Sequence, residues 1–361
     1  MDNFNPEHSP KDTQRDTFKK QIRIAREAGL PVIVHSREAK NDTLHILQEE
    51  ALDVPGVLHC FSGDIEMARK AIDLGFYISL AGPVTFRNAK NLREVAQFIP
   101  DERLLIETDA PYLSPVPMRG KRNEPSFLKY TAQVLSDIRG VTLNDIARIT
   151  TLNAKKLFRI GKISDRGEIA YKIRNSLYLN ITNRCTNSCG FCVRFHRSFV
   201  KGHNLDLQKE PSGEEIIEAI GDPKQYKEIV FCGLGEPLLR LDIVKKVSVW
   251  IKQKGGKVRI NTNGHGNLIH KRNILPELKG LVDSLSISLD AENEKTYEEV
   301  CRPAFKNSFQ SVVSFIQKAK ESIPEVVVTV VDIPEINIQK CKELAKKLGV
   351  DIRIRKFDVV G

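Results

Sequence analysis

Three cysteines lie within eight positions of the chain, in the stretch CTNSCGFC, as Cys185, Cys189 and Cys192. Cysteine thiolates bind iron–sulfur clusters or zinc. Three thiolates can hold three corners of a [4Fe–4S] cube and leave the fourth iron open to a small ligand, as a catalytic cluster requires. The alternative is a closed zinc site that adds His196, four residues after Cys192. The spacing alone leaves both hypotheses open.

Residues that could bind a polar ligand also follow the strands predicted after the cysteine loop. Glycines allow a close approach of the backbone to a ligand, a carboxylate accepts hydrogen bonds from an amino group, and amides and hydroxyls bind polar groups such as a ribose. The three segments are GLGEP, NTNG and SISLD, and their candidate residues are Gly233, Gly235, Glu236, Asn261, Ser286, Ser288 and Asp290. Each segment alone also fits an ordinary turn, and it is their order behind three clustered thiols that favours a binding site.

This ordered set of motifs resembles the radical S-adenosylmethionine (radical SAM) superfamily over about residues 165–361. The family's C-x₃-C-x-Φ-C signature matches CTNSCGFC with Phe191 as the aromatic, and GLGEP matches its G-G-E-P-type turn. The likeness is strongest to radical SAM proteins associated with, or fused to, TatD-type nucleases.

The resemblance implies that the three cysteines ligate one [4Fe–4S] cluster and that S-adenosylmethionine (SAM) chelates its open iron. Phe191 would lie near the adenine and Glu236 would hold the methionine amino group, and the other strand-end residues would be further SAM contacts. One electron, from a flavodoxin- or ferredoxin-type donor, would cleave SAM to methionine and a 5′-deoxyadenosyl radical, which takes a hydrogen atom from a small-molecule or nucleotide substrate. His196 would then be a loop residue or a substrate contact. Cys232 and Cys301 are expected to be packing residues.

Metal-type ligands follow three predicted strands of the first half. They are His35 in VIVHSRE, His59 in VLHCFSG and Asp109 in LLIETDAPYL. A single histidine at a strand end is usually only packed or hydrogen-bonded, whereas three such residues that converge on one barrel mouth favour a divalent-metal site of Mg, Mn or Zn.

The blocks PVIVHSREA, HCFSG, ETDAPYL and TTLNAKKLF resemble the TatD family of metal-dependent hydrolases, over about residues 5–160. Members of that family cleave DNA or other phosphoesters, which implies contact with DNA. The family begins with a strand carrying an H-x-H pair and later supplies a glutamate, and neither precedes residue 20 here. We therefore expect a truncated reading frame that lacks the N-terminal strands and leaves His35, His59 and Asp109 as an incomplete site.

The elements that position these residues alternate short β-branched runs with amphipathic helical patterns, which predicts an α/β fold. We expect two (β/α) barrel-type domains: an incomplete TIM-like barrel in residues 1–160, and a six-stranded partial (β/α)₆ barrel in residues 172–361, joined by the polar linker 161–171. Such folds place their chemistry at the carboxyl ends of the strands. The strands are predicted within 31–36, 56–61, 76–80, 104–109, 176–182, 228–233, 257–263, 283–290, 326–332 and 351–357.

Bulk composition agrees with a cytoplasmic two-domain protein. The chain has 361 residues, with 41% hydrophobic and 28% charged. It has no apolar run long enough for a membrane span and no apolar segment typical of a secretory signal. Residues 1–160 carry a net charge of +2, which leaves +8 of the total +10 to the second half. That excess fits either a solvated surface or attraction to a nucleic acid or a phosphorylated or carboxylated substrate.

The leading hypothesis is therefore a radical SAM enzyme fused to a TatD-like phosphoesterase or DNase domain. The alternative is a divalent-metal-dependent, TatD-type deoxyribonuclease with an accessory iron–sulfur domain. A remoter alternative is a nucleic-acid-binding module stabilised by zinc on Cys185, Cys189, Cys192 and His196, which would give GLGEP and SISLD no role.

Overall fold

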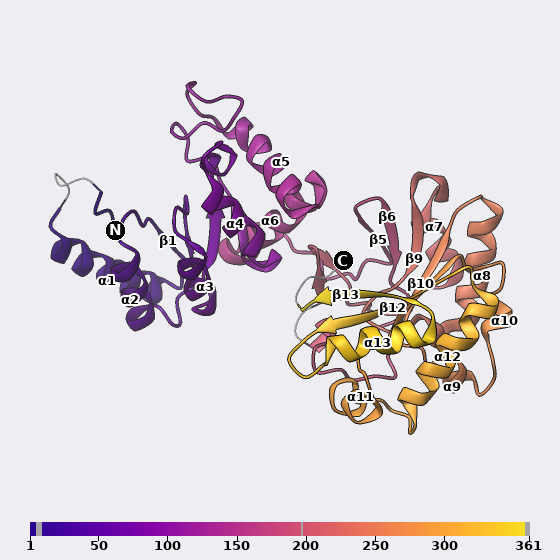
Figure 1. Cartoon of the computed structure of the whole chain (residues 1–361). Coiled ribbons are helices and arrows are strands. Elements are labelled where there is room, and N and C mark those ends of the chain that lie inside the picture. The colour runs from indigo at the N-terminus through magenta and orange to yellow at the C-terminus, as the bar shows by residue number, and fades with distance from the viewer. Residues whose placement is uncertain (5–8, 196–197, 358–361) are drawn as a thin grey trace. The chain divides into compact units, whose positions relative to one another are not determined.

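The computed structural model describes residues 1–4, 9–195 and 198–357 (Figure 1). The chain divides into two compact units, Met1–Ile163 and Ser164–Gly361. Both are α/β, with helices alternating along the chain with parallel strands. A search of the described ranges finds no helix with the length and apolar character needed to cross a membrane.

The first unit contains a four-stranded parallel sheet in the order β1-β2-β3-β4. Its strands are β1 (Val32–Val34), β2 (Gly56–Leu58), β3 (Tyr77–Leu80) and β4 (Leu104–Ile106). Sequential parallel strands place all their carboxyl ends at one edge, so residues that directly follow them converge there.

Helices connect these strands and bury most of their apolar side chains in one core, while Val57 and Leu105 are buried with Leu157 in a smaller cluster. They are α1 (Lys11–Ala28), α2 (Lys40–Glu50), α3 (Ile65–Asp73), α4 (Lys90–Phe98), α5 (Leu128–Arg139) and α6 (Leu143–Phe158), with the short 3-10 helices η1 (Gly82–Thr85), η2 (Asp101–Arg103) and η3 (Pro125–Phe127). Helix α6 begins with a reciprocal cap, in which Thr142 accepts from the Asp145 N–H and the Asp145 carboxylate accepts from the Thr142 N–H.

The second unit contains a seven-stranded sheet in the order β13-β12-β11-β10-β9-β6-β5. Six of these strands are parallel and follow one another in sequence order, and β5 pairs antiparallel with β6. The strands are β5 (Ala170–Ile173), β6 (Ser176–Leu179), β9 (Glu228–Phe231), β10 (Val258–Thr262), β11 (Ser284–Ser288), β12 (Glu325–Asp332) and β13 (Asp351–Lys356). A small hairpin of β7 (Phe199–Val200) and β8 (His203–Asn204) follows the cysteine loop.

Helices cover one face of this sheet, as Figure 1 shows for α8, α12 and α13. They are α7 (Gly213–Ile220), α8 (Leu241–Gln253), α9 (Gly266–His270), α10 (Leu275–Leu278), α11 (Glu294–Cys301), α12 (Ser308–Ser322) and α13 (Ile338–Leu348), with the short 3-10 helices η4 (Val193–Phe195), η5 (Pro223–Gln225) and η6 (Pro237–Arg240). On β10 and β11 every second residue, such as Ile260 and Ile287, is fully buried against them, and on the edge strand β13 Ile352 and Ile354 are partly buried. The intervening residues therefore face the opposite side.

All ten predicted strands are present, and the α/β class is confirmed. Neither sheet closes into a barrel over the residues that the structure describes. The sequence interpretation missed β5, which begins at Ala170 inside the segment expected to be a linker, and the β7–β8 hairpin. β5 has four residues and each hairpin strand has two, so any alternation of apolar residues is too short to be recognised in the sequence.

Candidate functional site

The cysteine loop leaves the carboxyl end of β6 and is held against the end of α11. The Ser188 N–H donates to the Cys301 carbonyl at 3.0 Å, and the Gly190 N–H donates to the Val300 carbonyl at 3.1 Å. Within the loop, the Cys192 N–H donates to the Cys189 carbonyl at 3.0 Å. These backbone hydrogen bonds hold the loop against the end of α11.

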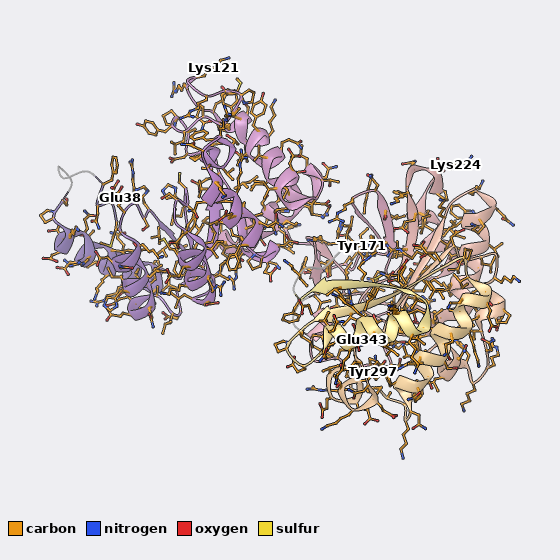
Figure 2. All side chains as sticks on the ribbon, viewed as in Figure 1. Glu38, Lys121, Tyr171, Lys224, Tyr297 and Glu343 are labelled. Atoms are coloured by element: carbon orange, nitrogen blue, oxygen red, sulfur yellow. The ribbon has the colours of Figure 1, made fainter. Side chains whose placement is uncertain are left out.

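A buried polar network supports the loop from below. The His265 ring lies between the Thr186 hydroxyl (Nδ1 to Oγ1, 2.9 Å) and the Tyr297 hydroxyl (Nε2 to Oη, 3.1 Å). Tyr297, labelled in Figure 2, accepts a hydrogen bond from Asn187 Nδ2 at 3.1 Å, which leaves its own proton for His265 Nε2. Burial lowers the pKa of His265 to about 4, so its ring is neutral at pH 7.

The three thiols are partly exposed and have donors nearby. Cys185 Sγ accepts from the Asn187 N–H at 3.4 Å and from Asn263 Nδ2 at 3.7 Å. Burial raises the pKa of Cys185 to about 12 and also raises that of Cys192. Metals bind the thiolate, so loading of this site must release protons, and the two N–H donors then stabilise the charge on Cys185.

The separation of the thiols bears on the choice between a cluster and zinc. Tetrahedral zinc with Zn–S bonds of about 2.3 Å needs sulfurs roughly 3.8 Å apart. Among the described residues, one group of three or more metal-type side chains has its ligand atoms all within 4.8 Å of one another, and that group lies in the first unit. The sulfurs of the cysteine trio are therefore not all within 4.8 Å of one another, so at least one pair is wider apart than a tetrahedral zinc site needs. His196 lies outside the described residues.

Cys301 lies beside the trio at the end of α11. It is buried, and its contact with the Cys189 thiol, together with burial, raises its pKa. Cys232 is partly exposed, and the side-chain amide of Asn261 interacts with its thiol. None of the seven cysteines, all of which are among the described residues, forms a disulfide.

Glu236 joins the ends of β9 and β10. One carboxylate oxygen accepts from the Leu238 N–H (2.9 Å) and the Thr262 hydroxyl (2.8 Å), and the other accepts from the Asn263 N–H (2.7 Å). The side chain is 2% exposed, and burial raises its pKa to about 7. The second oxygen has accepting capacity left for a further donor.

The two glycines of GLGEP allow close packing of chain on chain. A Cβ on Gly235 would lie 2.3 Å from the Arg184 carbonyl oxygen and 2.5 Å from that of Thr182, and one on Gly233 would lie 2.2 Å from Asn180 Oδ1. The sequence interpretation assigned both glycines to a ligand. In the structure they let the GLGEP turn lie directly against the segment that leads into the cysteine loop.

The remaining predicted contacts lie on the sheet face opposite the helices or at its carboxyl edge. Asn261 and Ser286 are register neighbours on β10 and β11. Ser288 at the end of β11 is the neighbour of Thr329, and Asp290 accepts from the Val331 N–H at 3.1 Å. Phe191 packs at the margin of the main core.

Polar atoms without partners gather around the cysteine loop. Of five buried side-chain polar atoms that lack a hydrogen bond in the described structure, three are Asn180 Oδ1, Asn187 Oδ1 and Arg194 Nε. Two acceptors and one donor suit a ligand that carries both an ammonium and a carboxylate. Together with the three thiols of the loop, they fit an iron–sulfur cluster with SAM.

In the first unit, four side chains meet at the carboxyl edge of the sheet. His35 Nδ1 lies 3.1 Å from His59 Nε2, and His59 Nδ1 lies 3.0 Å from Glu107 Oε1. Ligand atoms of His59, Glu107 and Asp109 all lie within 4.8 Å of one another. His35, His59 and Asp109 were expected there, whereas Glu107 was not.

The surroundings shift the pKa values of the two histidines in opposite directions. The hydrogen bond with Glu107 raises the pKa of His59, whereas burial lowers that of His35. Asp2 also approaches His35, with 3.4 Å between Oδ2 and Nε2. Two carboxylates and an imidazole of this kind are hard and borderline donors that suit Mn²⁺, Zn²⁺ or Mg²⁺.

The sequence contained a signal for one of the two missed residues, Glu107, but none for the contacts of His265. Glu107 precedes Asp109 by two positions, and residues two apart at a strand end share a side of the sheet. His265 directly follows NTNG, although no local pattern indicates that it contacts Thr186 and Tyr297.

Comparisons with known proteins assign the two units to two families. Residues 1–159 match the family described as TatD related DNase, and residues 179–348 match the radical SAM superfamily. The chain thus contains a TatD-type domain followed by a radical SAM domain, and both domains indicate an enzyme.

Individual relatives cover one unit or the other. An uncharacterized metal-dependent hydrolase, YabD of Bacillus subtilis, is 52% identical over 153 residues, which is 42% of this chain and 60% of YabD. The TatD homolog YjjV of Escherichia coli has a TM-score of 0.41 at 29% identity, with 45% of this chain and 62% of YjjV covered. Streptococcus suis SuiB has a TM-score of 0.38 at 13% identity, with 63% of this chain and 45% of SuiB covered. The chain spans 56–60% of the length of the curated relatives that it matches.

Proposed function

We propose that residues 172–361 form a radical SAM domain that cleaves SAM reductively at a [4Fe–4S] cluster, joined through 161–171 to a hydrolase domain of residues 1–160. The observation that carries the proposal is the gathering of three partly exposed thiols and three unpartnered polar atoms over the carboxyl edge of six sequential parallel strands. We interpret the six strands as a partial (β/α)₆ barrel and the first sheet as part of an incomplete TIM-like barrel.

In this proposal Cys185, Cys189 and Cys192 hold the cluster. When bound, the cluster and SAM supply a one-electron cleavage of SAM that yields methionine and a 5′-deoxyadenosyl radical. Phe191 would flank the adenine, and the strand-end residues would contact SAM. These residues are Gly233, Gly235, Glu236, Asn261, Ser286, Ser288 and Asp290.

Residues of the chain orient the cofactor and stabilise the charges of the SAM ammonium and of the Cys185 thiolate. Glu236, held on three sides by hydrogen bonds, presents its remaining acceptor capacity to the methionine ammonium. Asn263 donates to both the Cys185 sulfur and the Thr186 hydroxyl, and so places a thiolate-stabilising amide at the loop. The neutral His265 keeps the loop anchored without adding a positive charge beneath the cluster.

Metal content after anaerobic reconstitution tests the proposal. We expect about four irons and four sulfides per chain in the wild type. Cys189→Ala should lose most of them, whereas Cys341→Ala, in a buried cysteine on α13, should retain them as the matched control. One stoichiometric zinc with no iron uptake would contradict the proposal and favour the zinc module.

A second candidate function belongs to the first unit, because His59, Glu107 and Asp109 form a compact ligand group beside His35. We propose a divalent-metal-dependent hydrolase of phosphoesters, with DNA as a candidate substrate. The two carboxylates would bind the metal, and the pair His59–Glu107 would orient one imidazole towards it. Metal-dependent cleavage of single-stranded DNA that is lost in Asp109→Asn would support it.

We further propose a flavodoxin- or ferredoxin-type electron donor and a cytoplasmic location. Both follow from the radical SAM proposal, because a low-potential cluster needs a reductant and free thiols persist in a reducing compartment.

A further inference from the structure

Two arginines on β13 face the same side of the sheet as the predicted SAM contacts. Ile352 and Ile354 pack against the helix-covered core, so the residues that alternate with them, Arg353 and Arg355, are directed to the opposite face. On β11 the same alternation buries Ile287 against the helices and leaves Ser286 and Ser288 on that opposite face.

Strand register places the arginines at the carboxyl end of that face. Ser288 is the neighbour of Thr329, and Thr329 is the neighbour of Arg353, so the three form a row across β11, β12 and β13. Arg355 lies one row further on, beside Val331, whose N–H donates to Asp290. The pair thus lies at the edge from which the cysteine loop and the GLGEP turn also emerge.

Among the described residues, neither of these two arginines has an ion-pair partner. A third arginine of this face, Arg259, forms an ion pair with Glu228 at 3.0 Å and is largely buried. By contrast, Arg353 and Arg355 form no ion pair or hydrogen bond with any side chain in the ranges that the structure describes, and both are exposed.

The positive charge of Arg355 also acts on two residues of neighbouring strand ends. Burial raises the pKa of Cys232 and of Asp290, and in each case the charge of Arg355 opposes the shift. The guanidinium therefore lies within electrostatic reach of the end of β9 and the end of β11.

We infer that Arg353 and Arg355 bind an anionic group, a phosphate or a carboxylate, on the substrate of the proposed radical reaction. Guanidinium groups bind both anions through paired hydrogen bonds. The inference rests on the proposed function for the identity of the reaction, and it adds the substrate class: a molecule with a phosphate or carboxylate at one end and the hydrogen to be abstracted beside the cysteine loop.

Two ordinary explanations make different predictions. The first is that charged residues on an edge strand such as β13 serve only to prevent pairing with other chains. In that case replacing the two arginines would not change phosphate binding. The carboxylate of SAM itself is a second source of the same ligand chemistry, and binding of SAM must therefore be measured separately.

Binding of inorganic phosphate to the reconstituted, oxidised full chain tests the inference by equilibrium dialysis. We expect saturable binding that is at least roughly tenfold weaker in Arg353→Gln/Arg355→Gln. The matched control, Lys254→Gln/Lys257→Gln, removes two exposed cations at the amino end of β10 and should bind phosphate like the wild type.

Dialysis with labelled SAM forms the second arm. SAM affinity should stay within about twofold of the wild type in the arginine variant. Equal phosphate binding by all three proteins, an equal loss in the lysine control, or a parallel loss of SAM binding would each overturn the inference. Failure of the proposed function shows itself differently, as absence of the cluster or of SAM binding in the wild type.

Discussion

The carboxylate of Glu236 accepts a hydrogen bond from the backbone N–H of Asn263 at 2.7 Å, and the side chain of Asn263 in turn donates to the sulfur of Cys185. One asparagine at the end of β10 therefore connects the buried acid of the GLGEP turn with the first cysteine of the loop. Residues that are distant along the sequence, at positions 185, 236 and 263, are thus linked by hydrogen bonds at one edge of the sheet.

Glu236 should make SAM affinity depend on pH. Burial raises its pKa to about 7, and an ammonium group beside it would favour the charged form and lower that pKa. At a pH below the pKa that Glu236 has without SAM, binding of SAM then releases a proton from Glu236. The affinity for SAM should therefore rise from about pH 6 to about pH 8 and stay constant at higher pH.

The Glu236→Gln variant removes this titration. It should bind SAM at least roughly tenfold more weakly at pH 8 and show little change of affinity with pH. Equilibrium dialysis with the oxidised, cluster-loaded protein measures both profiles. If the SAM affinity of the wild type did not change with pH, or if the variant showed the same pH dependence as the wild type, Glu236 would not bind the SAM ammonium.

Gly235→Ala should disrupt the packing of the GLGEP turn. The new Cβ would meet two backbone carbonyl oxygens at 2.3 and 2.5 Å, and backbone atoms cannot move aside as a side chain can. Overpacking of this kind costs about 1–3 kcal/mol or more. Gly213→Ala is the control, because the Cβ there meets only the flexible side chain of Lys246.

Fluorescence of Trp250 measures this effect in the correct part of the chain, because Trp250 is the only tryptophan and lies on α8 of the second unit. The urea midpoint should fall clearly for Gly235→Ala and little for Gly213→Ala. Equal midpoints for the two variants would show that the close contact at Gly235 is not needed.

His265 should make the second unit sensitive to acid. Burial lowers its pKa from 6.5 to about 4, so below pH 6.5 the unfolded chain takes up a proton that the folded chain refuses. Above pH 6.5 His265 does not affect the free energy of unfolding. As the pH falls from 6.5 to about 4, His265 lowers the free energy of unfolding by up to roughly 3 kcal/mol.

The variant His265→Gln isolates that contribution. Glu236, whose pKa is raised, acts in the opposite direction over an overlapping range, and it is present in both proteins. The difference in stability between wild type and variant, measured by urea unfolding and Trp250 fluorescence, should therefore shrink as the pH falls from 6.5 towards 4. A difference that is constant with pH would show that His265 titrates normally.

The sequence predicted what depends on local pattern. Alternating apolar residues located all six parallel strands of the second unit, and the thiols, Glu236 and the serines of SISLD lie at their ends as expected. What depends on contact across the fold was missed. The orientation of Tyr297 and Asn187 around His265, the approach of Cys301 to Cys189 and the role of Gly235 in packing all require residues that are distant along the chain.

The first unit should bind one divalent metal through His59, Glu107 and Asp109. Asp109→Asn should weaken Mn²⁺ binding by at least roughly tenfold, because it removes a charged ligand. His45→Gln on α2 is the control, since His45 is exposed and belongs to no ligand group among the described residues. Mn²⁺ electron paramagnetic resonance measures free and bound metal, and equal affinity in both variants would exclude this group as the site.

We propose that Cys185, Cys189 and Cys192 form the catalytic centre of a radical SAM enzyme. The decisive assay is formation of 5′-deoxyadenosine from SAM, under dithionite and without oxygen. We expect 5′-deoxyadenosine from the reconstituted wild type and from Cys341→Ala, and none above background from Cys189→Ala. Wild-type turnover by Cys189→Ala, or no 5′-deoxyadenosine from a wild type loaded with about four irons, would contradict it.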